Sequence, residues 1–157
     1  MTIGMEESSN GRDHILIRME PATAGPGKNV AQRKDKLRIA FQEQVPRSVL
    51  ERIKQTLSGQ LVRISVTFLL WKSSPEFTNT RPVKDLDNLL KILLDAIGSS
   101  NGGLGLVKED SYICEVNAQK ELVDDEKDEG YKISFEPYND DEMLKVLENY
   151  LSNTKSS

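Results

Sequence analysis

Residues 84–97, Lys-Asp-Leu-Asp-Asn-Leu-Leu-Lys-Ile-Leu-Leu-Asp-Ala-Ile, decide the fold of this chain. On a helix with 100° per residue, the leucines fall in one continuous apolar arc, which predicts a surface that faces a core. A second, narrow arc is polar and consists of Asp87, Lys91 and Asp95. We therefore expect a core-packed helix with one polar stripe, and we expect Asp85 to precede its first helical turn.

Two interpretations of this polar stripe are open on these residues alone. Carboxylates beside a lysine on a rigid helix can hold a hydrated divalent cation next to a phosphate. The same residues also suit an ordinary surface helix, because Asp85 is a good N-cap and Asp87 suits the positive end of the helix dipole. Lys91 is then simply the (i, i+4) neighbour of Asp87 and of Asp95. Evidence from residues outside the helix is needed to decide between a metal site and an ordinary surface helix.

Hydrophobic periodicity predicts one α+β domain around this helix. Alternating apolar residues indicate strands, and a 3.6-residue period indicates helices. The expected strands are 13–19, 61–71, 111–120 and 131–136, and the expected helices are 29–44, 46–57, 84–97 and 140–151. Their order, β-α-α-β-α-β-β-α, predicts a small mixed sheet with packed helices in a single domain over residues 12–151.

The remaining segments are expected to lack regular structure. Residues 1–11 and 152–157 are interpreted as flexible tails. Residues 98–105 contain four glycines and are predicted to be a flexible connector. Residues 121–130 hold six acids and one lysine, and they join two strands either as a long hairpin or as a disordered loop.

Composition excludes several kinds of site. The chain has one histidine, His14, and one cysteine, Cys114, which excludes an internal disulfide framework and argues against histidine-rich zinc sites and histidine-based triads. A metal would have to be held mainly by oxygen, which suits Mg²⁺ or Mn²⁺. Residues 25–29 resemble a phosphate-binding loop, but Ala22 and Asn29 stand where glycine and Ser/Thr are needed, so no nucleotide cofactor is expected.

The charge distribution is uneven. The net charge is −4, but residues 121–130 contribute −5, so the rest of the chain sums to +1. Residues 28–54 hold eight Lys/Arg and three acids, a local +5. Such a patch can bind phosphate although the whole protein is acidic, and the same run is equally consistent with a solvated helix face. No apolar run has the length of a membrane span, and the N-terminus is unlike a signal peptide.

The segment Glu109-Asp110-Ser111-Tyr112-Ile113 opens a predicted strand that ends at Lys120. Upstream lie Asp85-Leu86-Asp87-Asn88-Leu89-Leu90-Lys91 and Leu94-Asp95-Ala96-Ile97. Residues 81–120 thereby resemble the RusA family of Holliday-junction resolvases. That family has a D-x-D-N-x-x-K helix ending in an L-D-A-hydrophobic step, then an acidic pair before a strand that closes on lysine.

The resemblance implies roles for individual residues. The essential metal-binding acids would be Asp85, Asp87 and Asp110, and the catalytic lysine near the scissile phosphate would be Lys91. Lys84 and Lys120 would contact the DNA backbone. Two further acids carry low weight: Glu109 stands where the family usually has aspartate, and Asp95 either supports the site or is only a helical neighbour of Lys91.

The function implied is that of a Mg²⁺-dependent endodeoxyribonuclease, with Mn²⁺ as a possible substitute, that resolves Holliday junctions by paired symmetric nicks in DNA recombination and repair. Two nicks related by a two-fold axis need two sites, so a homodimer is expected. We also expect a cytoplasmic protein that associates with the nucleoid when it binds DNA. Two alternatives are a non-catalytic nucleic-acid-binding or assembly protein that keeps the fold, and a general branched-DNA or flap nuclease.

Overall fold

The computed structural model describes residues 5–7, 13–23, 29–74, 84–99 and 102–155. Its centre is a five-stranded sheet in the order β1-β2-β5-β3-β4. The strands are β1 (Met5–Glu7), β2 (Asp13–Arg18), β3 (Leu61–Trp71), β4 (Ile113–Val123) and β5 (Gly130–Tyr138). β3 and β4 are parallel, and all other neighbours are antiparallel. The predicted α+β class with a mixed sheet is confirmed.

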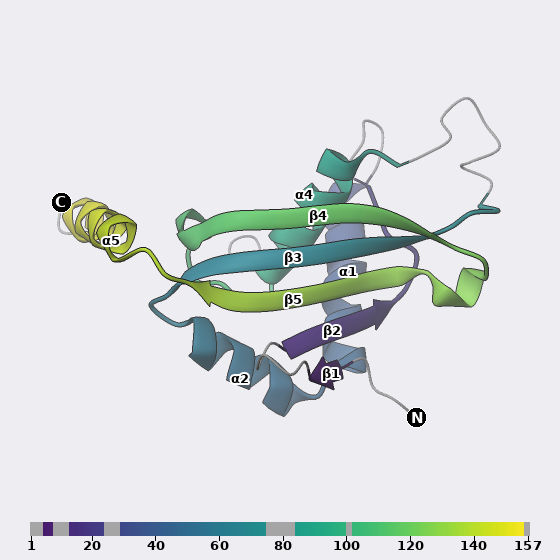
Figure 1. Ribbon diagram of the computed structural model, residues 1–157, viewed down its shortest axis with the longest axis horizontal. Helices are drawn as coiled ribbons and strands as arrows, with labels where there is room; N and C mark the ends of the chain where they lie inside the picture. The colour runs from purple at the N-terminus through teal and green to yellow at the C-terminus, as the bar shows by residue number, and fades with distance from the viewer. Residues whose placement is uncertain (1–4, 8–12, 24–28, 75–83, 100–101, 156–157) are drawn as a thin grey trace.

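The expected helices are also present. They are α1 (Val30–Gln44), α2 (Arg47–Leu57), α4 (Leu86–Ile97) and α5 (Asp141–Lys155), with two short 3-10 turns, η2 (Asp110–Tyr112) and η3 (Glu126–Asp128). Figure 1 shows α1 and α4 behind the sheet, the opposite sheet face without a helix over it, and α5 projecting at one end. Among the described residues, no helix is long and apolar enough to cross a membrane.

The core lies between the sheet and α1, α2 and α4. Residues of β3 alternate between buried and half-buried, as expected for a strand with one face on a core. Phe68 meets Tyr131 of β5 edge to face, with 5.6 Å between the ring centroids. The apolar arc of α4 is confirmed in part. Leu89 and Leu93 are fully buried, whereas Leu86, Leu90 and Leu94 are half-buried; Ile92 and Ala96, outside the predicted arc, are buried as well. Burial of these side chains fixes α4 on the sheet and turns its polar stripe outward.

The parallel pair of β3 and β4 contains one irregularity. Val62 pairs with Ile113, but Arg63 pairs with Glu115, so Cys114 is an extra residue in β4. Beyond this bulge, the even-numbered residues of β4 share the helix-covered side of the sheet with the buried residues of β3.

Some predicted boundaries are wrong. Residues 5–7, expected in a flexible tail, form an edge strand on β2, and α5 continues past the predicted end of the domain to Lys155. In the acidic segment 121–130, β4 runs to Val123 and η3 leads into β5, which confirms the hairpin alternative. Residues 1–4, 8–12 and 156–157 lie outside the described part of the chain, as do residues 24–28 of the loop that resembles a phosphate-binding loop.

The order β3-α4-β4 determines where the candidate residues lie. Because β3 and β4 are parallel and joined through α4, the helix runs back in the opposite direction. The start of α4 therefore lies near the ends of β3 and β4, and the end of α4 lies near the start of β4.

Candidate active site

The first candidate residue, Asp85, stands outside the helix as predicted. Its backbone is extended, with φ −70° and ψ 132°, and its carbonyl oxygen accepts the Leu89 N–H at 3.1 Å. Its side chain makes no capping hydrogen bond and is exposed. The interpretation of Asp85 as an ordinary N-cap requires such a bond. The carboxylate therefore remains available for another partner.

The polar stripe of α4 is present without its expected ion pairs. Asp87 and Lys91 are exposed and Asp95 is half-buried. The ion pairs formed within the described part of the chain include neither Asp87–Lys91 nor Lys91–Asp95. The stripe lines one concave surface of about 510 Å³ together with Leu90, Leu94, Asp110 and Ile113.

Asp110 reaches this surface through a tightly packed segment that follows α4, and we call its residues 102–109 the return loop. The backbone N–H groups of Leu104, Gly105 and Leu106 donate to the carbonyls of Ala96, Gly98 and Ile97, at 2.7, 2.8 and 2.9 Å respectively. These bonds satisfy carbonyl groups that a helix end otherwise leaves without partners. The described part of the segment 98–105 is thus closely packed against α4, and for these residues the prediction of a flexible connector is wrong; residues 100–101 lie outside the described part.

The three candidate acids divide between the two ends of α4. A Cβ added to Gly98 would stand 3.0 Å from Asp110 Oδ1, so Asp110 lies beside the end of the helix. Asp85 lies at the start, and twelve helical residues rise about 18 Å. Within the described residues, no three His, Cys, Asp or Glu side chains are grouped closely enough to hold a metal ion together. Asp110 does return to the polar side of α4, but one chain does not assemble the expected three-acid site.

The two predicted DNA-contacting lysines have different surroundings. Lys120 is exposed, and its Nζ donates to the Lys84 carbonyl at 3.2 Å, next to the start of α4. The Lys84 side chain is only 9 % exposed, and its Nζ donates to the Pro21 carbonyl at 2.5 Å and lies 3.3 Å from Glu20 Oε1. Lys84 thus joins the segment after β2 to the start of α4, and these contacts argue against the predicted DNA contact.

A buried acid lies at the same end of the molecule. Glu129 is 7 % exposed, and its Oε2 accepts the Trp71 N–H at 3.2 Å. Burial raises the pKa of the Glu129 carboxyl, the Trp71 N–H lowers it, and the charge of Glu20 raises it further. Sequence patterns give no sign of this residue, because it stands within a run of acids that predicts only a long hairpin or a disordered loop.

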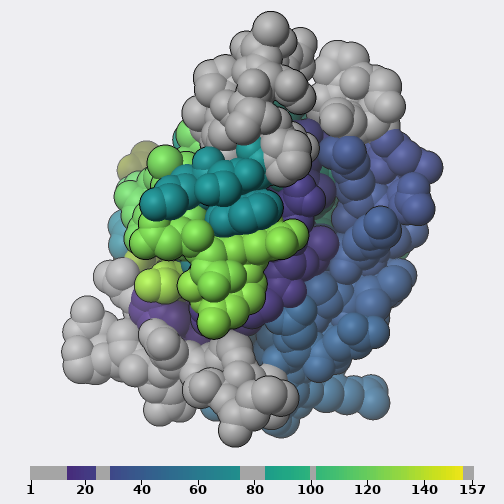
Figure 2. All heavy atoms as spheres, turned by 90° about the vertical axis from the view of Figure 1, so that its right-hand side faces the viewer, coloured from purple at the N-terminus to yellow at the C-terminus, as the bar shows by residue number. Residues whose placement is uncertain are grey.

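The acidic hairpin between β4 and β5 projects beside the end of β3. Figure 2 shows it in bright green next to the teal residues that follow β3. Asp124 Oδ1 lies 2.7 Å from Lys72 Nζ, and this contact lowers the pKa of Asp124. Most of the acidic side chains on the hairpin are exposed, so its field disfavours DNA at this edge.

The low-weight acid Glu109 precedes η2 and is half-buried. The pKa of Tyr112 is raised by burial, then by the charges of Glu148 in α5 and of Glu109. The Glu109 side chain therefore lies within electrostatic reach of Tyr112. This position gives no direct support for a role of Glu109 in metal binding.

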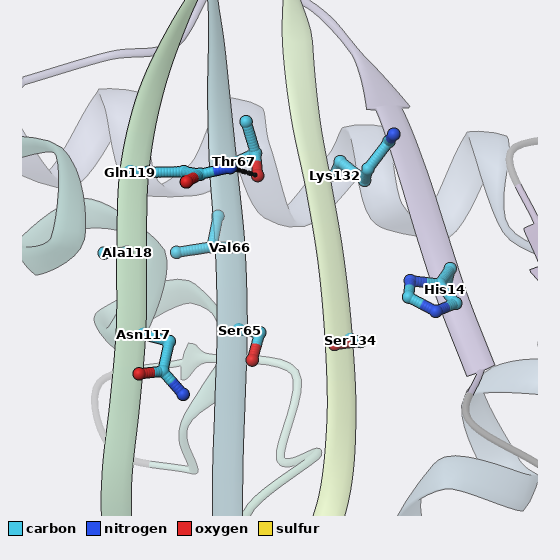
Figure 3. A pocket seen from close by; sticks show the side chains of 9 residues that line it. All are labelled: His14, Ser65, Val66, Thr67, Asn117, Ala118, Gln119, Lys132 and Ser134. Atoms are coloured by element: carbon cyan, nitrogen blue, oxygen red, sulfur yellow. Dashed lines mark hydrogen bonds between the residues drawn. The ribbon is translucent and has the colours of Figure 1, made fainter. Parts of the chain in front are cut away.

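Sequence reasoning missed a second polar surface, on the uncovered face of the sheet. A shallow hollow of about 270 Å³ is lined there by side chains from four strands. Figure 3 shows its hydroxyl, amide and basic groups: His14, Ser65, Thr67, Asn117, Gln119, Lys132 and Ser134. Gln119 Nε2 donates to Thr67 Oγ1 at 3.1 Å. The lining has no carboxylate, so it suits polar contact better than metal-assisted hydrolysis.

Comparisons with known proteins leave the family open. No family model matches the chain, no curated protein matches it, and no solved structure matches its fold. The resemblance to RusA resolvases therefore rests on the residues of segment 81–120 and remains a prediction.

Proposed function

We propose that this chain is a divalent-cation-dependent endonuclease that cuts branched DNA, with four-way junctions as its substrate. One observation carries the proposal: Asp87, Lys91, Asp95 and Asp110 line the same concave surface, and no ion pair joins Lys91 to either neighbouring acid on α4. An ordinary solvated helix would use these charges on each other. Here they remain available for a substrate.

The residues have complementary tasks on a phosphodiester. Lys91 would stabilise negative charge on the phosphoryl oxygens or on the leaving group. Lys120, exposed beside the start of α4, would hold the DNA backbone. The aspartates repel phosphate unless a cation lies between them, which is the physical reason to expect a requirement for Mg²⁺ or Mn²⁺. Because one chain does not bring three acids together, we assign no step to the ion.

A two-fold dimer could bring together in one site the acids that lie at opposite ends of α4, Asp85 and Asp87 at its start and Asp110 beside its end. In such a dimer a surface packs on its own copy, so that residue i meets j and j meets i. If the polar stripes of two α4 helices pack antiparallel, Asp110 of one protomer approaches Asp85 and Asp87 of its partner. The arrangement creates two equivalent sites, which is what paired symmetric nicks require.

The test is nicking of a synthetic four-way junction by the purified chain with Mg²⁺, and again with EDTA. We expect nicking that EDTA abolishes, and a loss of at least about 100-fold in Asp87→Asn with junction binding retained. Asp141→Asn, an exposed aspartate in the first turn of α5, is the matched control and should nick normally. Binding without nicking by the wild type would support the non-catalytic alternative. Equal rates on flaps and junctions would support a general branched-DNA nuclease.

A further inference from the structure

A second concave surface lies on the helix side of the molecule, between α1, α2 and the return loop. It has a volume of about 450 Å³. Its charged lining consists of Arg38, Arg47, Lys54 and Glu51, three cations and one acid, which sum to +2. The structure thus collects part of the basic run 28–54 around one hollow, which we call the basic groove.

The cations of the basic groove are weakly engaged. Arg38 Nε lies 3.8 Å from Asp35 Oδ1, and Lys54 Nζ lies 3.5 Å from Glu51 Oε1, with all four side chains at least 28 % exposed. Such surface pairs contribute at most about 1 kcal/mol, so a phosphate can replace them. Arg47 is exposed and forms no ion pair within the described part of the chain.

The start of α2 adds to the positive potential. α2 begins at Arg47 after Pro46, which has no side chain that can cap the helix. The first N–H groups of the helix therefore lack side-chain partners there, and the positive end of the helix dipole coincides with the Arg47 guanidinium. Both features favour an anion at this end of the basic groove.

One wall of the basic groove is the return loop, which packs closely against the end of α4. A Cβ on Gly103 would stand 2.1 Å from the Gly98 carbonyl and 2.7 Å from the Asp95 carbonyl, so this position excludes a side chain. Asp95 also lines the candidate active site. The return loop therefore lines the basic groove and also packs against the helix that carries the acids and Lys91 of the candidate active site.

We propose that the basic groove binds the sugar–phosphate backbone of a DNA arm adjoining the strand cut at Lys91. This inference rests on the proposed function, since it extends the same substrate across the return loop. Because the return loop lines the basic groove and is hydrogen-bonded to the end of α4, which lines the candidate active site, the two hollows are neighbours and one backbone strand can contact both. The contact is to phosphate, so it adds affinity without base preference.

The test compares Arg47→Gln/Lys54→Gln with Lys127→Gln/Lys132→Gln. The control pair removes two exposed cations from the β4–β5 hairpin and the uncovered sheet face. Junction affinity is measured by fluorescence anisotropy in EDTA over a series of salt concentrations. In the groove variant, the slope of log K against log salt should decrease by about 2, since each lost phosphate contact removes about 0.9. The control should keep the wild-type slope, and nicking at saturating DNA should be unchanged in both.

The outcomes distinguish a failure of the basic-groove proposal from a failure of the proposed nuclease function. A wild-type slope in the groove variant, with a wild type that nicks junctions, overturns the basic groove and leaves the nuclease intact. An equal loss of slope in both variants also overturns it, because the effect is then one of total charge. A wild type that neither binds nor nicks junctions refutes the proposed function, and the groove proposal fails with it.

Discussion

The two ends of α4 differ in the hydrogen bonds that cap them. At its C-terminal end, three backbone N–H groups of the return loop bond to the carbonyls of Ala96, Ile97 and Gly98. At its N-terminal end, Asp85 occupies the capping position and makes no cap bond. α1 shows the ordinary solution, since Asn29 Oδ1 accepts the Gln32 N–H at 3.0 Å. One end of α4 is thus closed by backbone hydrogen bonds, and at the other the exposed Asp85 carboxylate makes no capping hydrogen bond.

The largest expected effect tests whether the two ends work together across a dimer. Asp87→Asn and Asp110→Asn should each lose nicking by at least about 100-fold. Mixed in equal amounts under conditions of subunit exchange, they should recover about a quarter of the wild-type nicking rate, because half of the dimers are mixed and each has one intact site.

The control for this mixture is Asp87→Asn with Asp85→Asn. These two acids belong to the same end of α4, so no mixed dimer regains an intact site. Equal inactivity of both mixtures would mean that each site is built within one chain, and would contradict the two-fold arrangement.

The next largest effect concerns the C-terminal end of α4, where the return loop bonds to the helix. Gly103→Ala would place a Cβ 2.1 Å from the Gly98 carbonyl, so the backbone must move. We expect a loss of about 3 kcal/mol in the free energy of unfolding, measured with urea. Gly102→Ala is the matched control: its φ is +78° but nothing lies within 4 Å of an added Cβ, so about 1 kcal/mol is expected. Equal losses would show that the loop yields easily.

A smaller effect compares the two capping positions. Asn29→Ala removes the hydrogen bond to Gln32 N and should lower the free energy of unfolding by about 1 kcal/mol. Asp85→Ala removes no cap bond, so the change should stay below about 0.5 kcal/mol while nicking is lost. A full capping loss at Asp85 would return it to the role of an ordinary N-cap.

The smallest expected effect is a pH dependence of the free energy of unfolding that arises from Glu129, near the N-terminal end of α4. Burial raises the pKa of Glu129 above its usual value of 4.5, so the folded state prefers the protonated form. Ionising this carboxyl therefore destabilises the wild type as pH rises through and above 4.5. Glu129→Gln should be more stable than the wild type at pH 7, and the difference should shrink toward pH 4 in urea unfolding. A constant difference across that range would contradict this origin.

Much of the fold could be predicted because strands and helices follow from the periodicity of apolar residues that are close in sequence. The alternation in β3 and the apolar arc of α4 depend on residues close in sequence; the first is confirmed, and the second is confirmed for Leu89 and Leu93. The return loop was mispredicted because four glycines suggest flexibility, whereas its hydrogen bonds go to a helix end that only the folded chain brings there. The inward turn of Lys84 likewise depends on the Pro21 carbonyl, 63 residues away.

The candidate site was predicted in its residues more than in its geometry. Asp87, Lys91 and Asp110 do share one surface, and Asp85 does precede the helix. The division of the acids follows from the parallel pairing of β3 with β4, because a helix that joins parallel strands must run back between them. Strand periodicity alone does not specify which strands pair, so this consequence could not be foreseen.

The bulge at Cys114 determines on which side of the sheet the Lys120 side chain lies. With the extra residue, Lys120 pairs with Phe68 on the helix-covered side of the sheet, where α4 carries its acids. In an unbroken strand that starts from the same pairing of Ile113, each later side chain would change sides. Lys120 would then project from the uncovered face, beyond reach of Asp85. Deletion of Cys114 would leave Lys120 opposite Phe68, whereas one residue inserted between Glu115 and Gln119 would turn this lysine to the uncovered face while every catalytic candidate remained in the chain.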